Sequence, residues 1–211
     1  MRKSFPPAGS HEDATGGLYL IAILPPPALA EEIKQVKRDF ANDYGAVYAL
    51  RTLPHITLQP PFKWSPGHEA VMREKLVFFA AMQRPFHLSV SGFGSFPHPG
   101  NKVIFLKVTE NEGLQRLHRN LMLYLRQSLG FRMLDTKVAF QPHITIAYRD
   151  LTTQQYEKAW PRYRHRTFAG DFAVDSFFLL KHNGKHWETA CECRLGPAKG
   201  GVSPEPPAFS F

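Results

Sequence analysis

The sequence predicts a globular protein of the α+β class, folded as one compact domain or two closely packed lobes. Segments with the apolar run or the alternation of strands, such as 17–24 and 86–96, are interleaved with segments of helical periodicity, such as 111–129. The chain has 211 residues, 43% hydrophobic and 13% aromatic, which is enough to bury a substantial core. A wholly disordered chain is therefore excluded.

The first part of the chain predicts two strands, each followed by a helix. Residues 17–24 form a short apolar run, and the prolines at 25–27 lead into a helix over 28–40. Residues 55–62 form the second strand, and residues 66–83 have apolar positions at helical spacing. A strand followed by a helix is thus predicted twice before residue 84.

The middle and last parts predict more strands around two helices. Residues 86–96 and 102–108 read as a hairpin, and a helix over 111–129 stops at Gly130. Residues 143–149 form a strand, after which Thr152 or Thr153 caps a short helix that Pro161 ends. Final strands are expected over 172–182 and 186–195, joined through the turn signal Asn183-Gly184.

Several features indicate a cytoplasmic protein. Residues 1–16 and 196–211 are rich in Pro and Gly and predict flexible tails, and no apolar stretch resembles a signal peptide or reaches the ~20 residues that cross a bilayer. Cys191 and Cys193 are the two cysteines, and we expect both to be reduced packing residues on one strand face. We expect a monomer that makes no membrane contact.

The chain is basic, with a formal charge of +8 and a pI near 9.6. Such a surface attracts phosphate-bearing partners before specific contacts form. Charge by itself does not identify the partner, because many basic proteins bind no nucleic acid.

A repeated motif carries the strongest functional signal. The sequence PHITL at 54–58 recurs as PHITI at 142–146. Alternate side chains of a strand share a face, so His55 and Thr57 project together, as do His143 and Thr145, while the intervening aliphatic residues face the core. One His-x-Thr on a strand is usually structural, whereas two copies in separate halves of one chain favour a shared site.

These residue types suit phosphoryl transfer. One histidine can take a proton from the attacking oxygen and the other can protonate the departing oxygen, because the imidazole pKa lies near ~6.5. The threonine hydroxyls can donate hydrogen bonds to the phosphate oxygens. Neither a metal nor another cofactor is then needed, and the remaining histidines show no metal-ligand spacing.

The two motifs resemble those of the 2H phosphoesterase superfamily, in particular its bacterial 2′-5′ RNA ligase and RNA 2′,3′-cyclic phosphodiesterase branch. The segment 91–108 also resembles the family's glycine-rich loop and following strand, so the resemblance covers 17–195. It implies a bilobal domain with two pseudo-symmetric α+β lobes around a cleft. It also implies that His55 and His143 are the acid and base, that Thr57 and Thr145 bind phosphate, and that RNA or nucleotide ends are substrates. Gln59 to Phe62 depart from many relatives, which bears on specificity.

Further substrate contacts are expected from basic and aromatic residues. Arg149 shares the parity of His143, so in a regular strand it would extend the same face, although a surface arginine fits equally well. Residues 160–168 interleave aromatic and basic side chains, and Arg162, Tyr163 and Arg164 can contact RNA there or simply form a solvated basic loop.

Three functions remain open from the sequence. The leading one is hydrolysis of 2′,3′-cyclic phosphate ends to 2′-phosphates, with 2′-5′ RNA ligation as the related reverse chemistry. The second is a phosphodiesterase for small cyclic nucleotides or 2′-5′ oligoadenylates. The third is a nucleotide-binding or RNA-binding module without turnover, which the four intact motif side chains disfavour.

Overall fold

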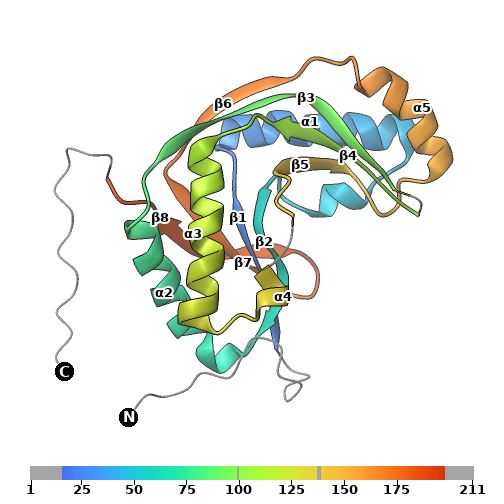
Figure 1. Ribbon diagram of the computed structural model, residues 1–211. Coiled ribbons are helices and arrows are strands. Elements are labelled where there is room, and N and C mark those ends of the chain that lie inside the picture. The colour runs from blue at the N-terminus through green and yellow to red at the C-terminus, as the bar shows by residue number, and fades with distance from the viewer. Residues whose placement is uncertain (1–15, 99, 137–138, 198–211) are drawn as a thin grey trace, which may run out of the picture.

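The computed structural model describes residues 16–98, 100–136 and 139–197. Its centre is an antiparallel sheet of eight strands in the order β6-β3-β4-β5-β2-β1-β7-β8, which curls strongly (Figure 1). The strands span Gly17–Ile23 (β1), Ile56–Trp64 (β2), Phe86–His98 (β3), Asn101–Val108 (β4), His143–Ala147 (β5), Ala169–Val174 (β6), Ser176–His182 (β7) and Trp187–Arg194 (β8).

Helices cover one face of this sheet and leave the motif face open. They span Pro27–Tyr44 (α1), Glu69–Ala81 (α2), Glu112–Leu129 (α3), Met133–Thr136 (α4) and Thr153–Tyr163 (α5), with 3-10 turns at Tyr48–Arg51 (η1) and Pro66–His68 (η2). Ile33 of α1, Leu76 of α2 and Leu121 of α3 lie in one buried cluster with strand residues such as Ile56 and Ile144. Burial of these apolar faces is what holds helices and sheet together.

The sheet consists of two halves that meet at its centre. One half holds β6, β3, β4 and β5, and the other holds β2, β1, β7 and β8. They join where Ile56 of β2 pairs with Ile144 of β5. This arrangement matches the expected pair of α+β lobes, and it sets the two motif strands side by side.

Local signals fixed several helix ends as expected. Asn111 caps α3 by accepting a hydrogen bond from the backbone N–H of Leu114 at 2.9 Å, and Gly130 ends the helix with a φ of 70°. Thr152 forms a capping box with Gln155 at the start of α5. These ends need only local hydrogen bonds, which explains why the sequence reveals them.

Two expectations about elements were wrong. The segment 172–182 is two strands and not one, because β6 pairs with β3 at one end of the sheet while β7 pairs with β1 near the other. Pro161 does not end α5, which runs on to Tyr163. The missing N–H of Pro161 affects only the last turn, and that turn is held by Tyr163, whose side chain is 3% exposed.

The remaining expectations concern the ends of the chain and membranes. Apart from Gly16, Gly196 and Pro197, the expected tails lie outside the described residues. Within the described ranges, no helix is long and apolar enough to span a bilayer.

Candidate active site

The two motifs place four polar side chains on one face of the sheet. Ile56 and Leu58 of β2 are buried in the core, as are Ile144 and Ile146 of β5. The alternating residues His55, Thr57, His143 and Thr145 are partly exposed on the opposite face. The alternation predicted from the sequence is therefore present in both strands.

The register between β2 and β5 brings the motifs together. Ile56 pairs with Ile144 in an antiparallel ladder. One residue to either side, this register sets His55 opposite Thr145 and His143 opposite Thr57, so each histidine faces the threonine of the other motif. The structure thus brings together all four residues predicted from the repeat.

Both imidazoles are tethered in the same way. Nδ1 of His55 lies 2.7 Å from the carbonyl oxygen of Leu53, and Nδ1 of His143 lies 2.7 Å from that of Gln141. A carbonyl only accepts, so each Nδ1 carries its hydrogen and donates it. Each Nε2 then has no partner among the described residues and is available to accept or donate a proton.

The surroundings lower the pKa of both rings. Burial lowers the pKa of His55 to about 4, against the raising effect of its bond to Leu53, and the charges of Lys37 and His143 lower it further. Burial likewise lowers the pKa of His143, opposed by its bond to Gln141.

The threonine hydroxyls are available to a ligand. Across the described parts of the chain, neither Thr57 nor Thr145 has a hydrogen-bond partner for its side chain, and both residues are partly exposed. A free hydroxyl beside an imidazole can donate to a phosphate oxygen without first breaking a bond within the protein.

Two phenylalanines form a wall beside His143. The ring of Phe96 lies 5.2 Å from the imidazole in an edge-on arrangement, and the ring of Phe105 lies 5.0 Å from it. Phe105 packs across the backbone of Gly94, where a Cβ atom would overlap the ring. The wall restricts the imidazole and limits the access of water to it.

A second apolar surface borders the motifs on the side of β1. Ala22 pairs with Thr57 and thereby continues the motif face. It belongs to a small cluster separate from the main core, which comprises Leu20, Ala22 and Leu180, with Leu24, Phe178 and Trp187 packed against them. The polar centre therefore lies between apolar surfaces, an arrangement suited to a nucleoside whose phosphate meets the polar residues.

Arg149 does not extend the motif face as its parity suggested. β5 ends at Ala147, and Arg149 has a left-handed φ of 61°, so the alternation stops before it. Its guanidinium donates to the hydroxyl of Tyr48 and lies 4.7 Å above the Tyr48 ring. Asp150 accepts hydrogen bonds at 2.8 Å from the backbone N–H groups of Val47 and Tyr48, which holds this loop against β5.

The basic and aromatic segment around α5 divides into buried and exposed residues. Tyr163 packs against Phe40, Tyr44 and Phe93 and is 3% exposed, so its ring cannot stack on a base at the surface. Arg162 and Arg164 are exposed. Their contact with RNA stays a prediction, and the buried ring of Tyr163 corrects the expectation for that residue.

No metal-binding cluster accompanies these residues in the described ranges, where no group of three or more His, Cys, Asp or Glu side chains could hold an ion. Cys191 and Cys193 point the same way from β8, with their Sγ atoms 4.0 Å apart, and burial raises the pKa of the Cys193 thiol. They are packing residues at the far edge of the sheet from β5.

A known protein family matches most of the chain. The model of the 2′-5′ RNA ligase superfamily matches residues 25–186, which include both motif strands. The chain belongs to this superfamily. It is therefore one of the 2H phosphoesterases, whose members act on phosphodiesters.

Other members of the superfamily align over most of the chain. "Putative phosphoesterase" of Geobacillus thermodenitrificans is 35% identical over 147 residues, covering 68% of this chain and 80% of its own. "RNA 2′,3′-cyclic phosphodiesterase" of Archaeoglobus fulgidus is 26% identical over 153 residues, covering 72% and 83%.

Solved structures share the fold. TT0787 of Thermus thermophilus superposes with a TM-score of 0.57 at 22% identity, covering 84% of this chain and 97% of its own. Escherichia coli LigT in its apo form also gives a TM-score of 0.57, at 21% identity and with 87% and 99% covered.

Two lysines near the motifs of this superfamily member were not predicted from its sequence. Lys107 of β4 pairs directly with His143, and its side chain lies over Gly92. Lys37 of α1 is buried close enough to His55 to affect its pKa. Lys107 and Phe105 are two positions apart in one predicted strand, so the sequence places them on the same face. Only the pairing of β4 with β5 shows that this face lies beside His143. No sequence signal pointed to Lys37.

Proposed function

We propose that this protein hydrolyses the 2′,3′-cyclic phosphate at an RNA or nucleotide end to a 2′-phosphate, without a metal ion. The observation that carries the proposal is the pairing of β2 with β5, which sets two imidazoles and two hydroxyls on one open face. Relatives named RNA 2′,3′-cyclic phosphodiesterase support this substrate class. Structures of LigT complexed with 3′-AMP and with NADP+ support a nucleotide ligand.

The two imidazoles supply both proton transfers. Nε2 of one neutral ring takes a proton from water as the water oxygen bonds to phosphorus. The bond between phosphorus and the 3′ oxygen breaks, and the other ring, protonated at Nε2, gives its proton to that oxygen. The product carries a 2′-phosphate and a free 3′ hydroxyl, and the rings regain their starting states by exchange with solvent.

The threonines stabilise the charge that develops on phosphorus. Thr57 and Thr145 donate hydrogen bonds to the non-bridging oxygens while the phosphorus is five-coordinate. Because each histidine stands opposite the threonine of the other motif, the hydroxyls hold the phosphorus between the two rings. A 5′ hydroxyl of a second strand in place of water would give a 2′-5′ linkage by the same proton transfers.

The experiment is incubation of the purified protein with a nucleoside 2′,3′-cyclic phosphate and an oligonucleotide ending in one, with and without EDTA. We expect a 2′-phosphate product in both buffers. Cleavage of 2′-5′-linked oligoadenylate with no action on 2′,3′-cyclic ends would instead favour the alternative enzyme. Binding without any product would favour a module that does not turn over.

Two matched variants test the roles of the histidines. His55→Asn and His143→Asn should each lower kcat by about 10²- to 10⁴-fold, the range of general acid–base catalysis, and the double variant should be little worse than either. His87→Asn is the control, because His87 is exposed on β3. Wild-type turnover by the double variant would exclude the mechanism.

A further inference from the structure

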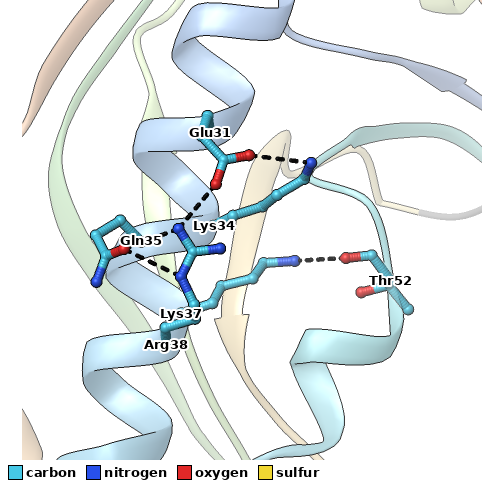
Figure 2. A network of polar contacts seen from close by, with 6 residues as sticks. All are labelled: Glu31, Lys34, Gln35, Lys37, Arg38 and Thr52. Carbon is cyan, nitrogen blue, oxygen red and sulfur yellow. Dashed lines mark hydrogen bonds and ion pairs between the residues drawn. The ribbon is translucent and has the colours of Figure 1, made fainter.

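A basic pocket lies next to His55 and outside the four motif side chains. It is formed between α1, the segment from η1 to β2, and the turn from β7 to β8, and its volume is about 360 Å³. Figure 2 shows the side of the pocket that α1 contributes. The polar and aromatic side chains that line it are Lys34, Lys37, Arg38, Arg51, His186 and Trp187.

The charges of this pocket are poorly balanced. Glu31 accepts from Lys34 at 3.3 Å and from Arg38 at 2.8 Å, so one carboxylate serves two cations (Figure 2). In the described part of the chain, Lys37 and Arg51 have no carboxylate within ion-pair distance, and Arg51 lies 5.3 Å over the Tyr48 ring instead. A second carboxylate, Glu188, contacts the pocket-lining His186 at 3.1 Å. The four Lys and Arg side chains are thus accompanied by two carboxylates, which leaves an excess of positive charge around the cavity.

Lys37 is the unusual member of this group. It is 2% exposed, and its ammonium donates to the carbonyl oxygens of Ala49 at 3.2 Å and Thr52 at 3.0 Å. Burial, together with the charge of Lys34, lowers its pKa to about 8. A buried cation that has only carbonyl partners is stabilised when an anion enters beside it.

The pocket is connected to the candidate active site through Leu53. That residue lines the pocket, and its carbonyl oxygen holds Nδ1 of His55. The charge of Lys37 also acts on His55. A ligand with a phosphate at the motif side chains and a second anionic group nearby can therefore occupy both places at once.

We propose, on the basis of the function proposed above, that this pocket binds a second phosphate of the substrate. The substrate is then an oligonucleotide, or a nucleotide with a further phosphate, and the cyclic end alone is a poorer ligand. Lys34 and Arg51 donate hydrogen bonds to the second phosphate, and the buried ammonium of Lys37 adds positive charge behind them. The Trp187 ring offers a flat apolar surface to the adjoining sugar or base.

The first experiment compares three substrates of the unmodified protein. They are a nucleoside 2′,3′-cyclic phosphate, the same nucleoside with an added 5′-phosphate, and a dinucleotide that ends in a 2′,3′-cyclic phosphate. We expect kcat/KM to rise by about tenfold with either added phosphate, and the gain to shrink as salt is raised from low to high. A gain with the dinucleotide alone would indicate a base contact and overturn the phosphate site.

Two outcomes separate this inference from the proposed function. No product from any substrate contradicts the hydrolysis itself. Product from all three at equal kcat/KM leaves hydrolysis standing and overturns the pocket as a phosphate site. Because this comparison uses no variant, it decides the question even if variants fail to fold.

The second experiment removes two exposed pocket cations together. Lys34→Gln with Arg51→Gln should bring the ratio of kcat/KM between the phosphorylated and unphosphorylated nucleotide close to one. Arg116→Gln on α3 removes a similar exposed charge away from the pocket and should keep the wild-type ratio. Thermal melting verifies that both proteins are folded. An unchanged ratio in the folded double variant would overturn the proposal.

Discussion

At the scale of single residues, the two motif histidines share one design. Each donates Nδ1–H to a carbonyl oxygen two residues earlier in the chain, which orients the ring and leaves Nε2 without a hydrogen-bond partner among the described residues. Pro54 and Pro142 stand between each histidine and its carbonyl partner and fix the backbone there. Each hydrogen bond therefore forms between residues that are close in the sequence, and the second motif repeats the arrangement of the first.

The lowered pKa values predict the pH dependence of kcat/KM. Productive protein has one neutral and one protonated ring, so activity falls when pH drops below the pKa of the base and when it rises above that of the acid. Because the pKa of His55 and that of His143 are both lowered, we expect a bell whose maximum lies below the ~6.5 of free imidazole. A rate profile still climbing between about pH 7 and 9 would be inconsistent with this pair.

The positive charge of Lys37 is expected to lower the pKa of His55. Burial is the main reason for the low pKa of His55, and the positive charge of Lys37 adds to it. In Lys37→Met the pKa of His55 should rise, which moves the limb of the kcat/KM profile that His55 controls to higher pH. Titration of the His55 ring by NMR measures this directly and needs no substrate.

The control for this prediction is Lys34→Met, which removes a neighbouring cation of the same pocket. The charge of Lys34 lowers the pKa of Lys37, whereas Lys37 and His143 are the charges that lower the pKa of His55, so the pKa of His55 should stay where it is. An equal shift in both variants would mean that the whole pocket, and not Lys37, sets the pKa.

At the scale of elements, the hairpin of β3 and β4 builds the aromatic wall. Gly94 pairs with Phe105, and the absence of a Cβ atom lets the Phe105 ring lie flat over the neighbouring strand toward His143. Phe96 packs against Phe105 with ring centroids 4.4 Å apart. The glycine-rich segment of this hairpin thus supports the site by leaving room for the Phe105 ring beside His143.

Gly94→Ala tests this arrangement. The new methyl overlaps the Phe105 ring, so the ring must move, and overpacking of this kind costs about 1 to 3 kcal/mol in the free energy of unfolding. We also expect a loss of activity, since His143 loses one side of its packing. Urea unfolding at constant m value gives the first quantity, and initial rates give the second.

Gly67→Ala is the matched control for the glycine. A Cβ atom at Gly67 would meet only the Ser65 side-chain oxygen at 3.9 Å, which is an ordinary contact. Stability and activity should therefore stay close to those of the unmodified protein. Backbone entropy by itself would make Gly→Ala slightly stabilising at either position, so equal losses at both would show that the loss at Gly94 does not come from overlap with Phe105.

At the scale of the whole molecule, the site depends on how the two halves of the sheet meet. Among the described residues, the ladder between the halves rests on the pair Ile56 and Ile144, both fully buried. The candidate site lies where the halves join, so the helices that cover the other face hold the motif strands in register. Both halves must fold before the two motif histidines can lie side by side.

Burial of neutral histidines also predicts loss of stability in acid. A histidine whose pKa is lowered by folding binds fewer protons when folded, so the free energy of unfolding falls as pH drops below the unfolded pKa near ~6.5. For His55, with a pKa of about 4, this loss amounts to roughly 2 kcal/mol between pH 7.5 and 5. His55→Gln should lose correspondingly less stability over that interval.

Denaturant unfolding at the two pH values measures the difference. His87→Gln, at an exposed position, should keep the full acid sensitivity of the unmodified protein. If His55→Gln and the unmodified protein lose stability in parallel, burial of the ring does not control its protonation.

The sequence by itself determined the four motif side chains, their shared face and most element boundaries. Strand alternation, helix caps and turn glycines act between residues a few positions apart, so they can be read directly from the sequence. Alternation alone places His55 with Thr57, and His143 with Thr145, on one strand face. The same local rules failed at Arg149, where a left-handed backbone ends the alternation, and at Asp175, where one apolar run divides into two strands.

Only the tertiary structure decided what stands beside the motifs. The pairing of β4 with β5 brings Phe105 and Lys107 to His143, and the packing of α1 brings Lys37 to His55. These neighbours are far apart in the chain, and their meeting depends on which apolar faces are buried against one another across the whole sheet. For that reason the pair of motif histidines can be predicted from the sequence, while the pocket next to them appears only in the fold.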